Sequence, residues 1–170
     1  MDITVEQPIN AIIYVEHVYQ GNLPQNSLKL TESIPWVNWM QTWLCSLSLT
    51  TELDQNCELS VRLTSDRQIQ SLNHQYRSLD QPTDVLAFAA TEADILIPLD
   101  IAEPRYLGDI IISLDTALRQ ATEQKHSLMV ELAWLSSHGL LHLLGWDHPE
   151  EVRLQQMLNK QSELIKLLNS

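Results

Sequence analysis

The spacing of hydrophobic and polar positions along the chain predicts alternating β-strands and α-helices. Alternation of apolar and polar residues is typical of half-buried strands, whereas apolar residues three and four positions apart are typical of helices. The pattern predicts strands at 11–20, 58–65, 84–90 and 106–115, loops at 21–27 and 91–105, and helices at 34–49, 66–79, 115–125, 128–144 and 149–168. Because no internal repeat or linker separates these segments, we expect one α+β domain over residues 1–170, in which helices pack on a small mixed β-sheet.

Two of the predicted helices have a distinct apolar face. In the segment 33–51, large apolar residues recur at helical spacing: Trp36, Trp39, Met40, Trp43, Leu44 and Leu47. The same segment contains several amide and hydroxyl side chains, so a buried amphipathic helix is favoured over a membrane span. In the helix 66–79, Asp66 is the expected N-cap, and one face is shared by Ile69, Leu72, Asn73 and Tyr76.

Composition and charge restrict the classes of partner. The chain has 170 residues and is 44% hydrophobic, which suits one domain with a substantial core. Its formal net charge of −12 argues against general binding to polyanions. The segment 59–82 departs from this trend, because it carries three arginines against two aspartates. These arginines form either a local basic strip or a scattered surface set.

The cysteines and the first residues of the chain bear on the compartment. Cys45 and Cys57 are expected to be small buried side chains rather than a disulfide or metal ligands. So few cysteines fit a reducing compartment. The first ten residues carry Asp2 and Glu6 where a signal peptide needs positive charge. We therefore expect a cytoplasmic protein with no membrane partner.

The segment HGLLHLLGWDH, residues 138–148, contains three histidines at a spacing that suits a metal ion. His138 and His142 are four residues apart, so on an α-helix they lie on one face, one turn apart. Gly145 can adopt a left-handed conformation that ends the helix and lets the chain fold back, which would bring in His148. Three imidazoles with an open fourth position are typical of a catalytic zinc site. The sequence thus predicts one Zn²⁺ ion at the C-terminus of a helix, with nickel and copper as alternatives.

The same spacing, H-x-x-x-H-x-x-G-x-x-H, also occurs in metzincin proteases. Those enzymes have a glutamate directly after the first histidine, and it serves as the general base. Here that position is occupied by Gly139, which cannot accept a proton. The pattern therefore keeps the metal ligands of a protease and lacks its base, so peptide hydrolysis by that route is disfavoured.

The histidine segment closely resembles the signature H-G-x-L-H-L-x-G-x-D-H of the YbeY family of bacterial endoribonucleases, also called rRNA maturation factors. Two upstream segments extend the resemblance: NHQYRSLDQPTDVLAF (73–88) is similar to N-x-x-Y-R-x-x-D-x-P-T-D-V-L-S-F, and LGDIIIS (107–113) is similar to L-G-D-I-x-I-S. The resemblance is strongest over residues 57–165, and the first 56 residues match only in outline. The chain departs from the family at Ala87, where serine is usual, and at Ala89, where proline is usual.

The resemblance implies that His138, His142 and His148 are zinc ligands and that Arg77 is a catalytic residue. It also implies a zinc-dependent, single-strand-specific endoribonuclease of the cytoplasm. Such an enzyme acts in rRNA maturation, notably at the 3′ end of the small-subunit rRNA, and in ribosome quality control. The expected partners are single-stranded RNA, including rRNA, and ribosomal components.

No dedicated general base stands out in the sequence. Three acidic residues are candidates for orienting a ligand imidazole, namely Asp84, Asp109 and Asp147. Each also suits a turn or a helix cap, and that interpretation is favoured for the first and the last. His74 and His126 have no supporting spacing and are expected to be ordinary surface residues.

Two alternatives to the nuclease remain at this point. One is a metal-dependent hydrolase that acts on another substrate, and the other is a non-catalytic ribosome assembly factor whose metal is structural. Arg77 suits a nuclease because a planar guanidinium binds phosphate oxygens in a fork. Without the resemblance, an exposed position at a helix C-terminus is favoured for it, because a cation there interacts favourably with the helix dipole. The oligomeric state is left open.

Overall fold

The computed structural model describes residues 9–90, 104–147 and 150–168. Its strands are β1 (Asn10–His17), β2 (Asn56–Thr64), β3 (Val85–Ala89) and β4 (Arg105–Ser113). Its helices are α1 (Gln25–Glu32), α2 (Trp36–Leu47), α3 (Asp66–Arg77), α4 (Leu114–Gln124), α5 (Leu128–Leu143) and α6 (Glu151–Leu167). The predicted α+β class with a small mixed sheet is confirmed.

The four strands form one sheet in the order β1-β2-β4-β3. β1 pairs parallel with β2, and β2 pairs parallel with β4, whereas β3 runs antiparallel to β4. Parallel neighbours need long crossover connections, which helices provide here. Among the strands that the structure describes, β3 therefore lies at the edge of the sheet. This edge is where the candidate site lies.

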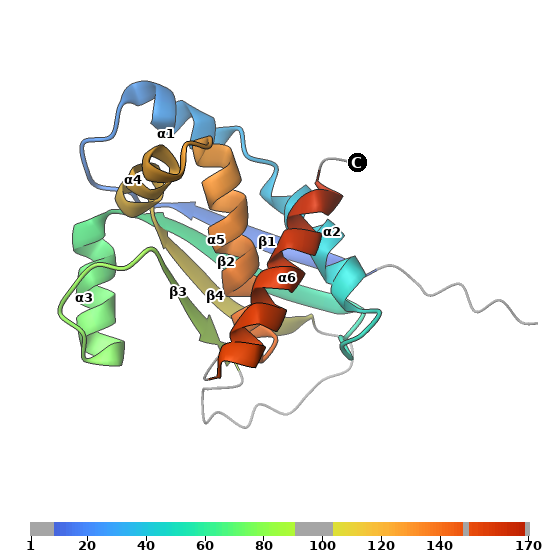
Figure 1. Cartoon of the computed structure of the whole chain (residues 1–170). Helices are drawn as coiled ribbons and strands as arrows, with labels where there is room; N and C mark the ends of the chain where they lie inside the picture. Colours follow the sequence, from blue (N-terminus) through green and yellow to red (C-terminus); the bar gives the residue numbers. More distant parts are fainter. Residues whose placement is uncertain (1–8, 91–103, 148–149, 169–170) are drawn as a thin grey trace, which may run out of the picture.

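Helices lie on both faces of the sheet (Figure 1). Successive residues of β4 pack alternately on the two faces. Ile110 and Ile112 belong to the main core, which also contains buried side chains of α2, α5 and α6. Ile111 faces the other way and packs with Ile69 of α3 and Leu86 of β3 in a smaller cluster. α5 thus lies over one face and α3 over the other.

The tryptophan-rich helix α2 is buried as predicted, although it is shorter at both ends than expected. Trp43 is fully buried, and its indole Nε1 donates a hydrogen bond of 2.9 Å to the carbonyl of Leu164 in α6. A buried indole N–H needs such a partner. Among the described residues we find no helix with the length and apolar character that a membrane crossing requires.

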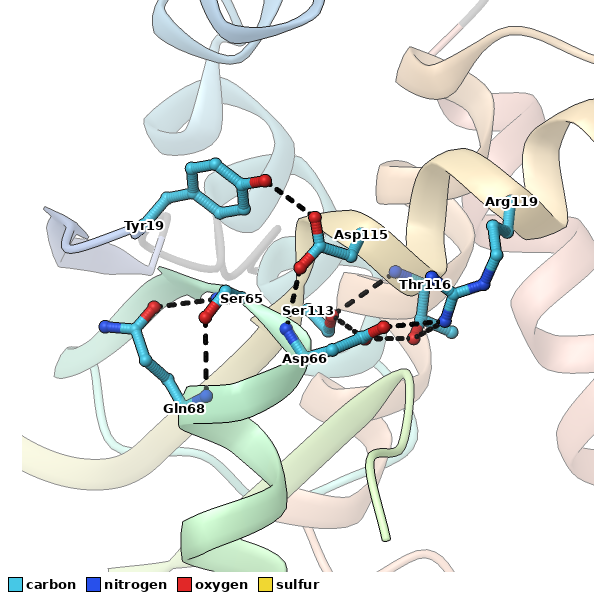
Figure 2. Close-up of polar contacts among 8 residues, drawn as sticks. All are labelled: Tyr19, Ser65, Asp66, Gln68, Ser113, Asp115, Thr116 and Arg119. Carbon is cyan, nitrogen blue, oxygen red and sulfur yellow. Dashed lines mark hydrogen bonds and ion pairs between the residues drawn. The ribbon is translucent and has the colours of Figure 1, made fainter. Parts of the chain in front are cut away.

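The N-termini of α3 and α4 meet and stabilise one another (Figure 2). Ser65, rather than the expected Asp66, is the N-cap of α3, and it forms a capping box with Gln68. Asp66 begins the helix, and its carboxylate instead accepts hydrogen bonds at α4, from Ser113, Thr116 and Arg119. In return, the carboxylate of Asp115 accepts from the backbone N–H of Asp66 and from the Tyr19 hydroxyl. Helix N-termini favour such acidic partners because their N–H groups are unpaired.

The segments around α1 and before β4 differ from the prediction. The expected loop 21–27 contains the start of α1, and β1 ends three residues before the predicted end of its strand. The expected loop 91–105 lies mostly outside the described residues, and β4 already begins at Arg105.

Candidate functional site

α5 carries the first two histidines, and its ends are well defined. The Ser127 side chain caps the N-terminus by accepting from the N–H of Val130. At the other end, Gly145 has a φ of 93° and donates from its N–H to the carbonyl of His142. Trp146 donates to the carbonyl of Leu141, which completes a Schellman motif. The predicted left-handed glycine at this helix end is confirmed, and the chain turns back directly after the second histidine.

His138 and His142 lie on the same side of α5, with their rings facing each other. Their Nε2 atoms are 3.0 Å apart, and their ring centroids are 4.5 Å apart at an interplanar angle of 77°. Both side chains are half-buried. The helical spacing of four residues has therefore brought two imidazole nitrogens to one point, as predicted.

Gln161 of α6 fixes the orientation of the His138 ring. Its side chain is fully buried, and its Oε1 lies 3.2 Å from His138 Nδ1. Its Nε2 donates to the carbonyl of Trp134 at 3.3 Å, so the amide oxygen is the atom that faces the ring. Nδ1 is then the nitrogen that donates to Gln161, and Nε2 is the nitrogen that lies next to His142. The sequence analysis did not identify Gln161. The available signal was a polar residue between Met157 and Leu164 on the buried face of α6.

The distance between the two Nε2 atoms fits a pair of ligands of one zinc ion. With Zn–N bonds of about 2.0–2.1 Å in a tetrahedral arrangement, two ligand nitrogens lie about 3.3 Å apart. The observed separation of 3.0 Å is close to that value. The third predicted ligand, His148, lies outside the described residues. Within the described ranges, no group of three histidine, cysteine or acidic side chains could hold an ion, so the zinc site stays a prediction.

Arg77 approaches the histidines from the other face of the sheet. It is the last residue of α3, and its Nη2 donates to the carbonyl of Ala87 in β3 at 3.2 Å. Its guanidinium carbon lies 5.4 Å from the centroid of the Phe88 ring. In the part of the chain that the structure describes, no carboxylate forms an ion pair with it.

One pocket brings these groups together. Arg77, His138 and His142 line a pocket of about 480 Å³, with β3 and the turn after α5 as its other walls. A larger and shallower hollow of about 700 Å³ beside α2 is lined by apolar and amide residues and has no titratable side chain. The smaller pocket is therefore the one with chemical groups. Ala87, one of the departures from the family pattern, lines it, and Ala89 is buried in the core.

The three acidic candidates differ in position. Asp84 lies directly before β3 and accepts from the N–H of Val85 and from the side chain of Gln120 in α4. Asp109 lies on the sheet face opposite α5, and its carboxylate accepts hydrogen bonds from the hydroxyls of Ser60 and Tyr106. Asp147 lines the pocket beside the two histidines.

The Asp109 cluster has a clear effect on the Tyr106 hydroxyl. Burial, together with the hydrogen bond to Asp109, raises the pKa of Tyr106 to about 12. The hydroxyl therefore stays protonated and donates to the carboxylate. Neither residue is oriented toward the imidazoles of α5.

The two remaining histidine predictions have different outcomes. His74 is exposed on α3, as expected. His126 is only partly exposed, and its Nε2 is hydrogen-bonded to the carboxylate of Glu131, a buried residue of α5. The expectation of an ordinary surface residue was wrong for His126, because a buried carboxylate needs a partner.

Gly139, between the two histidines, lets α5 approach the sheet. A Cβ at this position would lie 2.7 Å from Cγ2 of Ile110 in β4. The glutamate of a protease therefore has no room here. The close contact also sets how far the two imidazoles stand from the sheet.

Comparisons with known proteins show which family the chain resembles. The family model of endoribonuclease YbeY matches residues 23–169, so the family match begins well before residue 57 and includes α1 and α2. Endoribonuclease YbeY of a Picosynechococcus strain is 51% identical over 154 residues, which is 91% of each chain. That of a Synechococcus strain is 53% identical over 155 residues, or 89% of each chain.

A solved structure supports the fold. The solution structure of a Thermotoga maritima protein has a TM-score of 0.53 and 25% sequence identity, and the match covers 92% of this chain and 88% of that chain. The family model and the two relatives together cover nearly all of the described residues. This chain therefore belongs to the YbeY family of endoribonucleases.

Proposed function

We propose that this chain is a metal-dependent endoribonuclease that cuts single-stranded RNA, with rRNA as its cellular substrate. The observation that carries the proposal is the meeting of an arginine and two facing imidazoles in one pocket. The name endoribonuclease, which the relatives carry, supports the choice of RNA. The cytoplasm and contact with ribosomal components are part of the proposal.

The proposed ligands of one zinc ion are His138, His142 and His148. When bound, such an ion lowers the pKa of a water molecule or polarises a phosphoryl oxygen. Gln161 holds the His138 ring in the tautomer that presents Nε2. Two imidazoles thus bring their Nε2 atoms within 3.0 Å of each other at the pocket.

Arg77 is the proposed phosphate-binding group. Its bond to the Ala87 carbonyl uses one of the five N–H donors of the guanidinium and anchors the side chain at the edge of β3. The other donors can hold two oxygens of a phosphodiester and offset charge that develops during cleavage. Because no described carboxylate neutralises this arginine, one local cation can serve an RNA substrate on a protein whose net charge is −12.

The test is cleavage of a labelled single-stranded RNA by the full-length protein loaded with Zn²⁺. His142→Ala should abolish cleavage, and Arg77→Glu should slow it by about 10²–10³-fold, as expected for loss of a donor to a charged transition state. The matched controls are His74→Ala and Arg67→Glu, which change exposed residues of α3 away from the pocket. Both controls should cleave like the wild type.

The alternatives give different results in the same experiment. A peptide hydrolase would cleave casein and leave RNA intact, and Gly139 packed on Ile110 argues against it. An assembly factor with a structural metal would cleave neither substrate, and metal removal would unfold it. Equal RNA cleavage by the wild type and by the two pocket variants would refute the site.

A further inference from the structure

An exposed aromatic side chain stands next to the catalytic candidate Arg77. The helical spacing predicts that Tyr76 shares the buried face of α3 with Ile69 and Asn73. Ile69 is 0% exposed and Asn73 is 3% exposed, but Tyr76 is 59% exposed. The apolar face of α3 is therefore open to solvent at its C-terminal end.

Phe88 of β3 holds the Tyr76 ring in place. The two ring centroids are 5.3 Å apart, with an interplanar angle of 62°. Phe88 is itself half-buried and packs against the small cluster of Ile69, Leu86 and Ile111. An edge-to-face contact of this kind is favourable, and it restricts the tyrosine to one orientation. The outer part of the ring remains open to solvent.

Arg77 joins this aromatic surface to the pocket. Its guanidinium lies over the same Phe88 ring, at 5.4 Å from the centroid, and donates to Ala87, which lines the pocket. At the edge of β3 the exposed ring of Tyr76 is therefore followed in space by the guanidinium of Arg77 and then by the two imidazoles. A ligand that reaches Tyr76 can also reach the pocket.

This arrangement suits a single-stranded nucleic acid. Proteins recognise unpaired bases by stacking them on aromatic rings, while arginine binds the neighbouring phosphate. We propose that Tyr76, held by Phe88, is a stacking site for one nucleobase of single-stranded RNA whose phosphate is bound by Arg77. This inference rests on the proposed function. A base in a duplex is already stacked on its neighbours, so the site also explains a preference for single strands.

Tyr14 provides a matched comparison on the same side of the sheet. It is 50% exposed, but it lies on β1, and its hydroxyl donates to Glu58. A carboxylate next to a ring repels a phosphate backbone. Tyr14 therefore has an exposure close to that of Tyr76, but its hydroxyl is bonded to a carboxylate.

The test measures binding of a fluorescent single-stranded RNA octamer to the full-length protein by anisotropy, with EDTA present to prevent cleavage. Tyr76→Ala should raise Kd roughly 5- to 150-fold, the usual loss for one stacked base. Tyr76→Phe keeps the ring and should bind within about twofold of the wild type. Tyr14→Ala should leave Kd unchanged.

A set of octamers with one abasic position each separates stacking from general damage. At one position, removal of the base should weaken wild-type binding by a similar factor and should not weaken binding to Tyr76→Ala any further. Equal Kd values for the wild type and Tyr76→Ala would overturn the stacking site. So would a loss in Tyr76→Ala that is the same size with and without each base.

The proposed function can fail separately. A wild type that cleaves RNA, alongside a Tyr76→Ala variant that binds and cleaves equally well, refutes only the stacking site. A zinc-loaded wild type that cleaves no RNA refutes the nuclease itself, and with it the stacking site.

Discussion

The buried amide of Gln161 is expected to control metal affinity through His138. The substitution Gln161→Met keeps a side chain of similar length and volume but removes both hydrogen bonds of the amide. The Trp134 carbonyl keeps another partner, since the Ser137 hydroxyl also donates to it at 2.8 Å. The substitution therefore removes the hydrogen bond from Nδ1 of His138 to the amide oxygen.

The magnitude follows from that single loss. Loss of one hydrogen bond at a half-buried side chain costs about 0.5–1.5 kcal/mol of folding stability. Loss of a partner that orients a metal-binding histidine typically lowers metal affinity about 10- to 100-fold. We therefore expect Gln161→Met to bind Zn²⁺ with a Kd higher by about that factor, measured by competition with a coloured chelator.

Two further variants separate orientation from stability. Leu164→Ala removes a fully buried side chain one turn further along α6 and should cost about 2–5 kcal/mol in urea unfolding, with zinc affinity unchanged. Gln161→Glu keeps an acceptor for His138 Nδ1 and should retain most of the zinc affinity. The reasoning is refuted if Gln161→Met binds zinc like the wild type, or if Leu164→Ala loses as much affinity.

Three other outcomes test local features of the structure. Gly139→Ala should lower the free energy of unfolding in urea by about 1–3 kcal/mol, because the new Cβ would meet Ile110 at 2.7 Å; an unchanged midpoint would contradict the close contact. Burial raises the pKa of Asp66, but its three hydrogen bonds at α4 outweigh burial and lower the pKa below its usual value. The stabilising contribution of the Asp66 carboxylate is then present above pH about 4 and is lost as the pH falls through the lowered pKa. Asp66→Asn should therefore be less stable than the wild type at pH 7 and should lose less stability on acidification. Parallel curves of unfolding free energy against pH for the two proteins would count against this. Burial, aided by the charge of Asp54, raises the pKa of Cys57 to about 11. A disulfide reagent at pH 8 should therefore label the Cys57 thiol only after unfolding. Rapid labelling of Cys57 in the native protein would disprove its burial.

The sequence predicted those elements whose side-chain pattern matches their burial. α2 and α5 were placed within two residues at each end, since their apolar residues are the ones that the fold buries. α1 was missed, because Gln25–Glu32 has only two apolar residues and only Thr31 is buried in it. Its N-terminus also has no side-chain cap. Without periodicity or a cap, a sequence gives little sign of a helix.

The candidate site was predictable where it depends on local geometry. Two histidines four residues apart on a helix must face one side, and a glycine after them suits a left-handed turn. Gln161 and the position of His126 could not be found in this way, because each depends on contact with a different element. A polar residue on the apolar stripe of α6 was a sign of a buried partner, but the stripe did not identify that partner.

The edge position of β3 explains how groups from two faces of the sheet can meet. Arg77 reaches Ala87 over a short connection, from α3 on one face, while the histidines belong to α5 on the other. A central strand would have neighbours on both sides, and they would separate the two groups. In the antiparallel register, Ala87 pairs with Ile110, and Ile110 packs under Gly139 between the histidines. A slip of one residue would turn every side chain of β3 to the opposite face, so the same register that seals the core also sets Arg77 opposite the imidazoles.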